Sequence, residues 1–501
     1  MKIRLISLSV LSLLSSPLLA SAAPSGAYIR IPIYQGGEMT GGSALPSDSL
    51  SITLNPHSLT NARVGEPYLF DFSSIFSVAG AESYNTEDVS WSLKQDAVLP
   101  LGLSFSSAGI LSGTPAQKSL SGASFEVVAS YLGKTGENGY TIIVNGKKMR
   151  VSQMVSGGWH TCALTMEGGV KCWGSNSSGQ LGSGAQTNSL DPVDVEGLQS
   201  NITRISAGQN HTCALTNAGA ALCWGHNFYG QIGDASNEIA LTPKPVSTLT
   251  SKVSQIAAGY DHTCAVHDGA AKCWGSAQMS KLGNNSTTNR NAPVTASGLS
   301  TGVIGIAAGQ FHSCAIVTGG GVKCWGDNYY YQVGDSTRTQ RNTPVNVPGL
   351  SAGVSALDAG YYHTCARMSA GDIRCWGRNN HGQIGDGSLS NATTPASIDI
   401  GDPVKSVTAK GYHSCAVTTA GAVKCWGRNS EGQVGDESLT RRESPTPVSG
   451  LSEGVAEVSA GNAMACAVLE DGTAKCWGQN TFGQIGDSTM TLRPGPVDVV
   501  E

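Results

Sequence analysis

The sequence predicts an all-β protein in which a seven-bladed β-propeller follows a smaller β-domain. All 14 cysteines fall into pairs that recur about every 50 residues, and this unit occurs seven times. Glycine accounts for 64 of 501 residues, near twice the usual ~7%. Only 13% of the residues are charged, against roughly 25% in typical domains. Repeats of this length indicate propeller blades, and abundant glycine suits short strands joined by many turns.

The repeat that starts at Ile202 shows how one blade is expected to be built. Residues 202–206 alternate between apolar and polar and predict a first strand. Residues 211–215 and 222–225 predict a second and a third strand, and a long polar loop follows. Pro245 is expected to open a short fourth strand at the edge, where proline misses no ladder N–H. Four strands in one repeat are typical of a propeller blade.

The spacing of the cysteines agrees with the length of the hairpin between them. If Cys213 faces Cys223, a three-residue loop remains, and its third position is Gly219, as such loops require. The third repeat is one residue shorter, and its centre is Asp268-Gly269, a two-residue hairpin signature. Opposed Cα atoms on antiparallel strands lie ~4.5–5.5 Å apart, within disulfide range. We therefore predict seven disulfides: Cys162–Cys172, Cys213–Cys223, Cys264–Cys273, Cys314–Cys324, Cys365–Cys375, Cys415–Cys425 and Cys466–Cys476.

A metal site is the alternative interpretation of these cysteines. His211 and Cys213 share a strand face and Cys223 opposes them, so a Cys₂His set can be drawn in six repeats. A structural zinc site takes four ligands, and no fourth ligand is evident. Export would also favour oxidised cysteines. We therefore expect disulfides, with no metal and no cofactor.

Residues 1–22 have the organisation of a signal peptide, with Lys2 and Arg4, an apolar run, and a small-residue cleavage site before residue 23. The run is short for a membrane span, and no other stretch approaches ~20 apolar residues. We expect cleavage after Ala22 and a secreted, periplasmic or cell-surface location, with no membrane span. The formal charge is -5 without a basic run. This argues against nucleic acid as a partner, because phosphate binding needs clustered Lys and Arg.

A recurring string, Gly-x-x-His-(Thr/Ser)-Cys-Ala and then Cys-Trp-Gly-x-Asn-x-x-Gly-Gln-x-Gly-Asp, resembles the regulator of chromosome condensation repeat family. The resemblance covers residues 151–501 and implies a seven-bladed propeller. That family includes nuclear exchange factors for a small GTPase and secreted bacterial propellers such as a β-lactamase inhibitor protein. An exported, acidic, disulfide-rich chain is more similar to the second kind. Three repeats depart from the string, with Met464 for histidine, Lys281 within a lost Gly-Gln pair, and Tyr331 for glycine.

Residues 51–146 have short alternating strands and one tryptophan, Trp91. Together with the string at 99–115, they resemble the immunoglobulin-like, cadherin-like modules of bacterial surface proteins, and their length suits one β-sandwich. The acidic clusters that bind calcium in cadherins are missing, so no metal is implied. Residues 23–50, rich in Gly, Ser and Pro, are assigned to a linker, and residues 150–501 to the propeller.

Catalytic motifs are not evident, so we expect no enzyme. Six equivalent histidines (His160, His211, His262, His312, His363 and His413) favour a structural role, such as a hydrogen bond between blades. The tryptophan that follows the second cysteine of each repeat is expected in the core between blades. Asp234 and its equivalents are expected to cap turns.

Non-repeated aromatic residues are the candidate binding site. In an antiparallel blade, the loop before the histidine and the loop after the tryptophan leave on the same face. Variable aromatic residues in loops are the composition of a recognition surface. Plugging of the central channel is the alternative role for these rings. The candidates are Trp159, Tyr260, Phe311, Tyr361, Tyr362, Tyr412, Phe228, Tyr229, Tyr329 and Tyr330.

The sequence thus favours a monomeric, exported, non-catalytic protein that binds an extracellular or cell-surface protein or glycan. An inhibitor of a secreted or periplasmic enzyme is the second hypothesis. A hydrolase with its site in the central channel is the third. Guanine-nucleotide exchange is suggested by the family name only, and the expected signal peptide opposes it.

Overall fold

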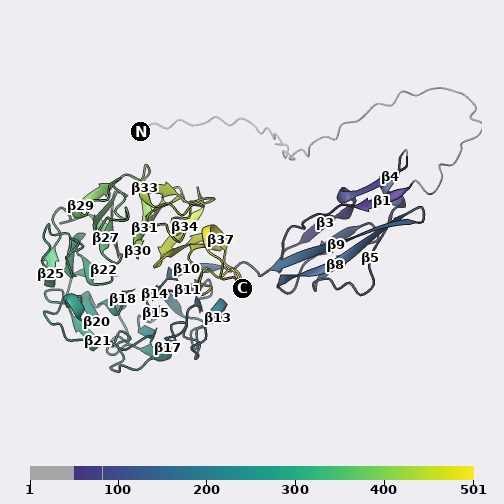
Figure 1. Ribbon diagram of the computed structural model, residues 1–501. Helices are drawn as coiled ribbons and strands as arrows, with labels where there is room; N and C mark the ends of the chain where they lie inside the picture. The colour runs from purple at the N-terminus through teal and green to yellow at the C-terminus, as the bar shows by residue number, and fades with distance from the viewer. Residues whose placement is uncertain (1–49, 82) are drawn as a thin grey trace, which may run out of the picture.

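The computed structural model describes residues 50–81 and 83–501. The expected signal peptide and all but the last residue of the expected linker lie outside the described residues. The described part is all-β, as the sequence predicts, with short 3₁₀ helices at η2 (Phe72–Ile75), η3 (Thr86–Asp88) and η4 (Gln278–Ser280). Figure 1 shows a β-sandwich followed along the chain by a ring of blades.

The sandwich holds its core between short antiparallel sheets. One sheet has the order β2-β9-β8-β5, a second β3-β7-β6, and β1 pairs with β4. The core contains Phe72, Leu111 and Ile142, none of which has any exposed surface. The strands are β1 (Ser51–Leu54), β2 (Ala62–Arg63), β3 (Tyr68–Asp71), β4 (Phe76–Ala79), β5 (Ser90–Leu93), β6 (Leu103–Phe105), β7 (Ile110–Gly113), β8 (Ser119–Tyr131) and β9 (Lys134–Asn145).

Seven four-stranded antiparallel sheets form the propeller, and each sheet takes its strands in chain order from the centre to the rim (Figure 1). The first strands are β10 (Val151–Ser156), β14 (Ile202–Ala207), β18 (Val253–Ala258), β22 (Val303–Ala308), β26 (Val354–Ala359), β30 (Val404–Lys410) and β34 (Val455–Ala460). The second strands are β11 (His160–Thr165), β15 (His211–Thr216), β19 (His262–His267), β23 (His312–Val317), β27 (His363–Met368), β31 (His413–Thr418) and β35 (Met464–Leu469). The third strands are β12 (Val170–Gly174), β16 (Ala221–Gly225), β20 (Ala270–Gly275), β24 (Gly321–Gly326), β28 (Ile373–Gly377), β32 (Val423–Gly427) and β36 (Ala474–Gly478). The fourth strands are β13 (Ser189–Asp194), β17 (Ala240–Pro245), β21 (Arg290–Thr295), β25 (Arg341–Asn346), β29 (Ala392–Ile398), β33 (Arg442–Pro447) and β37 (Arg493–Asp498).

The fourth strand of blade 2 corrects one expectation. Pro245 ends this strand instead of opening it, because pairing with the third strand already begins at Ala240, which lies opposite Gly225. Pro245 lies opposite Leu222. Proline is tolerated there because the fourth strand is the outer edge of the blade.

Disulfides join the second and third strands of every blade. Cys213 lies directly opposite Cys223 in the strand register, and their Cα atoms are 4.0 Å apart. The other six pairs have the same arrangement, with Cα separations of 4.0–4.1 Å. Gly219 adopts a φ of 75°, the left-handed conformation that the hairpin loop requires. Hairpin length and cysteine position are therefore matched in each blade.

Neighbouring blades are joined by buried polar groups as well as by apolar packing. The indole N–H of Trp274 donates to the carbonyl of Gln231 in the preceding blade at 2.9 Å. His211 is hydrogen-bonded through Nε2 to the hydroxyl of Thr263 in the following blade at 2.9 Å. Equivalent indole bonds occur at all seven interfaces, between blades 7 and 1 as well. The tryptophans and five of the six histidines thus have the structural roles that the sequence predicts. His413 is the exception, since neither of its ring nitrogens has a hydrogen-bond partner among the described residues.

The ring closes between blade 7 and blade 1 without exchange of a strand. Met149, Trp173 and Met464 belong to one buried cluster at this interface. The backbone N–H of Val151 donates to the carbonyl of Gly472 at 2.8 Å, and Lys148 pairs with Val500 in an isolated bridge. Each blade is therefore built from one continuous stretch of chain.

Candidate functional site

One face of the propeller carries the candidate binding residues, and we call it the aromatic face. It is formed by the loops between the first and second strands and between the third and fourth strands. The opposite face carries the disulfide hairpins and the connections between blades. Chain direction alone imposes this division, because alternate turns of an antiparallel sheet lie at opposite ends.

The longer loops are held rigidly from within. In blade 2, the side-chain oxygen of Asn227 accepts from the N–H of Ile232 at 2.9 Å, and Gln231 accepts from the N–H of Tyr229 at 3.0 Å. Asp234 accepts from the N–H of Ser236 at 3.0 Å, which is the turn cap that the sequence predicts. The repeated polar residues therefore build a scaffold, and the variable residues project from it.

Seven of the ten candidates form one continuous network, which we call the tyrosine cluster. Its members come from blades 3, 4, 5 and 6, and their ring centroids lie 4.9–6.2 Å apart, mostly edge to face. This is the favourable spacing for aromatic pairs. His381 extends the network, 5.2 Å from the ring of Tyr412. The members are Tyr260, Phe311, Tyr329, Tyr330, Tyr361, Tyr362 and Tyr412.

Three candidates lie apart from the tyrosine cluster in the pattern of ring contacts. Phe228 and Tyr229 contact each other in blade 2, with ring centroids 5.1 Å apart. Trp159 contacts Phe482 across the interface of blades 1 and 7, at 6.0 Å. Phe228 is 70% exposed and Tyr329 60%. Surface aromatic residues thus occur around the ring, whereas the contiguous patch is confined to four blades.

Tyr361 has a different position, because it closes the mouth of the central channel. Its hydroxyl donates to the side-chain oxygen of Gln209 at 3.0 Å, from blade 5 to blade 2. Lys410 stands where the six other repeats have glycine, and its ammonium donates to the carbonyls of Ala207 and Ala258, in blades 2 and 3. Burial raises the pKa of Tyr361 above its usual range. Channel plugging therefore accounts for Tyr361.

Sequence reasoning missed Arg378, which lies within the tyrosine cluster. Its guanidinium carbon is 4.5 Å from the ring centroid of Tyr330, 5.3 Å from that of Tyr412 and 5.5 Å from that of Tyr362. These distances are typical of cation–π contacts. The signal in the sequence is a basic residue directly after Trp-Gly, at a position that varies between repeats.

The channel below the mouth contains ionisable groups that the repeat does not explain. It is lined by the first strands of all seven blades and encloses about 340 Å³. Asp358 accepts from the N–H of Ala409 at 3.0 Å, and burial raises its pKa. Burial also raises the pKa of Glu457 to about 7, although Arg204 opposes the shift. These groups lie on different strands. The hydroxyl of Thr408 donates to the carboxylate of Asp358 at 2.9 Å and accepts from the N–H of Ala460 at 3.2 Å, so it links the first strands of blades 5, 6 and 7.

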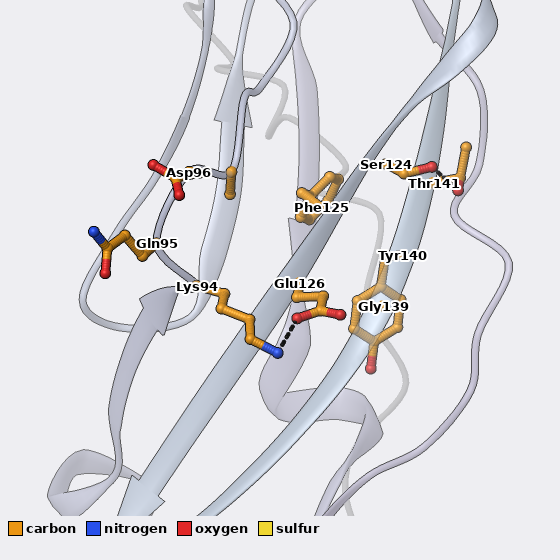
Figure 2. A pocket seen from close by; sticks show the side chains of 10 residues that line it. Lys94, Gln95, Asp96, Ser124, Phe125, Glu126, Gly139, Tyr140 and Thr141 are labelled. Atoms are coloured by element: carbon orange, nitrogen blue, oxygen red, sulfur yellow. Dashed lines mark hydrogen bonds and ion pairs between the residues drawn. The ribbon is translucent and has the colours of Figure 1, made fainter.

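A separate depression of about 420 Å³ lies on the sandwich (Figure 2). Lys94 is its central cation, and its ammonium pairs with Glu126 at 2.5 Å and with Glu137 at 3.2 Å. Exposed pairs of this kind contribute little to stability. The cation is already neutralised, so this depression is a weaker candidate than the aromatic face.

Within residues 50–81 and 83–501, no group of three or more His, Cys, Asp or Glu side chains could hold a metal ion. In that same part of the chain, no helix is long and apolar enough to cross a membrane.

Fold and site together define a seven-bladed propeller with a disulfide in each blade and one aromatic face. The chain belongs to the RCC1-like domain family, whose model matches residues 130–399, more than half of its length. Models of the regulator of chromosome condensation (RCC1) repeat match residues 404–433, 455–484 and 420–468. Residues 51–145 match the family described as "Putative Ig domain".

Curated relatives share the repeat and differ in length. The chain is 28% identical over 262 residues to the ultraviolet-B receptor UVR8 of Arabidopsis thaliana, covering 52% of this chain and 48% of the receptor. It is 33% identical over 250 residues to the E3 ubiquitin-protein ligase HERC2 of Homo sapiens, covering 48% of this chain and 5% of the ligase. The chain thus spans less than half the length of these relatives.

Solved structures agree with the fold. Prp20p from Saccharomyces cerevisiae superposes with a TM-score of 0.60 at 22% identity, covering 70% of this chain and 88% of Prp20p. Human WBSCR16 superposes with a TM-score of 0.57 at 22% identity, covering 64% of this chain and 86% of that chain. At this identity the likeness defines the propeller fold and nothing finer.

Proposed function

We propose that this protein is an exported, non-catalytic binding protein that recognises an extracellular or cell-surface macromolecule through its aromatic face. The tyrosine cluster is the observation that supports this proposal. It is contiguous, lies in loops on a rigid scaffold, and is formed by residues that differ from repeat to repeat. Tyrosine and arginine are enriched among the residues that dominate binding energies at interfaces.

The proposed location is supported by the seven disulfides, since such bonds persist in oxidising compartments and are rare in the cytosol. A non-catalytic role is supported by five of the six repeated histidines, whose Nε2 atoms are hydrogen-bonded across the interfaces between blades. The channel acids lie behind the mouth that Tyr361 and Lys410 span. A substrate that approaches from the aromatic face would therefore contact Tyr361 and Lys410 before it could reach these acids.

The experiment is capture of a partner from culture supernatant and cell-surface extract, followed by affinity measurements with variants. Tyr362→Ala should weaken binding at least about tenfold, because buried interface aromatics commonly contribute 2 kcal/mol or more. Trp159→Ala tests whether the surface extends to blades 1 and 7. Both variants should melt within a few degrees of the parent protein.

Matched controls lie on the opposite face. Glu167→Ala and Asn217→Ala alter hairpin residues and should leave the affinity unchanged. Loss of binding confined to these hairpin variants, with full affinity in Tyr362→Ala, would show that the aromatic face is not the binding surface. Capture of one secreted enzyme that loses activity on binding would define the protein as an inhibitor.

A further inference from the structure

We propose that Arg378 is the anion-recognition point of the aromatic face, and that the partner is a protein which presents an acidic segment to it. The inference rests on the proposed function and makes the partner's chemistry specific. The observation that carries it is an arginine fixed between three tyrosine rings from blades 4, 5 and 6.

Arg378 is held in position both at its backbone and at its guanidinium group. Its backbone N–H donates to the carbonyl of Tyr362 at 2.8 Å, and its guanidinium lies among Tyr330, Tyr362 and Tyr412. Those three rings also contact one another, at 5.1 Å and 6.2 Å. A guanidinium held in this way loses little further conformational freedom when it binds a ligand.

The hydrogen-bonding capacity of this guanidinium is unused within the described residues. It donates no hydrogen bond and forms no ion pair there, whereas Arg341 pairs with Asp335 at 2.5 Å in the adjacent blade. The nearby Asp327 is occupied by the side chain of Gln332, at 2.7 Å. Five N–H donors in a planar fork match a carboxylate, which can accept two of them in parallel.

Arg378 differs from the other arginines near the tyrosine cluster. Burial, then Arg378, Arg428 and Arg441, lower the pKa of His381. Arg428 and Arg441 are ion-paired with Glu431 and Glu443, so among the described residues Arg378 is the one of these three without an acidic partner. An unpaired guanidinium surrounded by aromatic rings complements an acidic segment in charge. Tyrosine and arginine together are the composition of protein hot spots, which favours a protein over an acidic glycan.

The test uses three capped probes of equal length: pentaglutamate, pentaglutamine and pentagalacturonate. We expect pentaglutamate to bind the full protein and to perturb tyrosine resonances, with an affinity that falls as salt rises. Arg378→Gln should weaken pentaglutamate binding at least about tenfold. Arg378→Lys should recover only part of it, because the ammonium keeps the charge and loses the fork. Lys252→Gln, on the opposite face, removes the same charge and should change nothing.

Three outcomes would overturn the inference. Pentaglutamate could fail to bind, could bind Arg378→Gln as well as the parent, or could be surpassed by pentagalacturonate in an Arg378-dependent way. Affinity measurements with the captured partner distinguish failure of this inference from failure of the proposed function. If the partner is lost in Tyr362→Ala and retained in Arg378→Gln, the aromatic face binds and the acidic-segment inference is wrong. Melting temperatures of all variants confirm that each is folded.

Discussion

Nε2 of His211 lies 2.9 Å from the hydroxyl oxygen of Thr263 in the next blade. That hydroxyl donates its single proton to the carbonyl of Gln231, also at 2.9 Å, so it must accept from the imidazole. His211 therefore carries its proton on Nε2, and Nδ1 is buried with no hydrogen-bond partner among the described residues. His160, His262, His312 and His363 repeat this arrangement.

These buried histidines should make stability depend on pH. Burial lowers the pKa of His160, His211, His312 and His363 to about 3, so the folded protein keeps them neutral. The unfolded chain takes up protons below its pKa of about 6.5. The stabilisation is thus complete above pH 6.5 and is lost as the pH falls towards 3, by up to about 1.4 kcal/mol per pH unit for each histidine.

Thermal melts between pH 8 and pH 4 measure this dependence. His211→Gln keeps a donor for Thr263 and removes the titrating group. Below pH 6.5, the free energy of unfolding should therefore fall less steeply with pH, by the contribution of one proton. The same pH dependence of stability in His211→Gln and in the parent protein would contradict the conclusion that His211 stays neutral in the folded state.

Asp261→Ala should destabilise blade 3 strongly. Its carboxylate pairs with Lys281, whose side chain is fully buried and also lies 5.0 Å from the ring of Phe311. Removing one member of a buried pair leaves an uncompensated charge and costs about 3–5 kcal/mol. Chemical denaturation measures this loss.

An exposed pair is the control, since Asp268→Asn removes the carboxylate partner of Lys252, and both side chains are about two-thirds exposed. Asparagine is used because residue 268 has a φ of 50°, which asparagine tolerates and alanine does not. The effect of this substitution should stay below about 1 kcal/mol. The double variant Asp261→Asn/Lys281→Gln restores the glutamine of the other repeats and should recover most of the stability. Equal losses from Asp261→Ala and Asp268→Asn would refute the buried pairing.

Reduction of the seven disulfides should lower the melting temperature and leave the propeller folded. Each bond closes a loop of 9 or 10 residues, worth roughly 2–3 kcal/mol in the chain-entropy model. These values do not add, because short loops retain structure in the unfolded chain. Calorimetry with and without reductant is the measurement. Absence of a cooperative transition at 25 °C after reduction would show that the blades depend on their disulfides.

Glu457→Gln should stabilise the protein at pH 8 and have little effect at pH 4. Burial raises the pKa of this channel carboxyl to about 7. Above the pKa of the unfolded side chain, about 4.3, the unfolded state gains by ionising and the folded state resists it until about pH 7. The melting temperatures of Glu457→Gln and of the parent at both pH values decide the matter. Ser459→Ala, on the same strand, is the uncharged control. It removes the acceptor of the Ser156 N–H, so any loss of stability that it causes should be the same at both pH values.

The repeat made most of the fold predictable. Hairpin length specified that Cys213 faces Cys223, and equivalence over the ring assigned His211 and Trp274 to the interfaces between blades. Pro245 was placed wrongly at the start of its strand, because edge pairing and not proline decides where that strand begins.

The sequence allowed us to predict on which face of the propeller the candidate residues lie, but not how their side chains contact one another. Chain direction placed Tyr361 and Tyr362 on the same face, yet neighbouring residues point differently, and only Tyr361 crosses the channel to Gln209. Arg378 acquires its role from rings in three blades. A local sequence pattern does not predict these contacts, because they depend on how the loops of successive blades are arranged in space.

Closure of the ring without strand exchange has a consequence for chain connectivity. Lys148 and Val500 pair with each other, so a short peptide could join the two ends of the propeller. The chain could then be reopened at any connection between blades, for example at Ser300. Such a circular permutant should form the same ring, because every blade would keep its four strands, its disulfide and both of its neighbours.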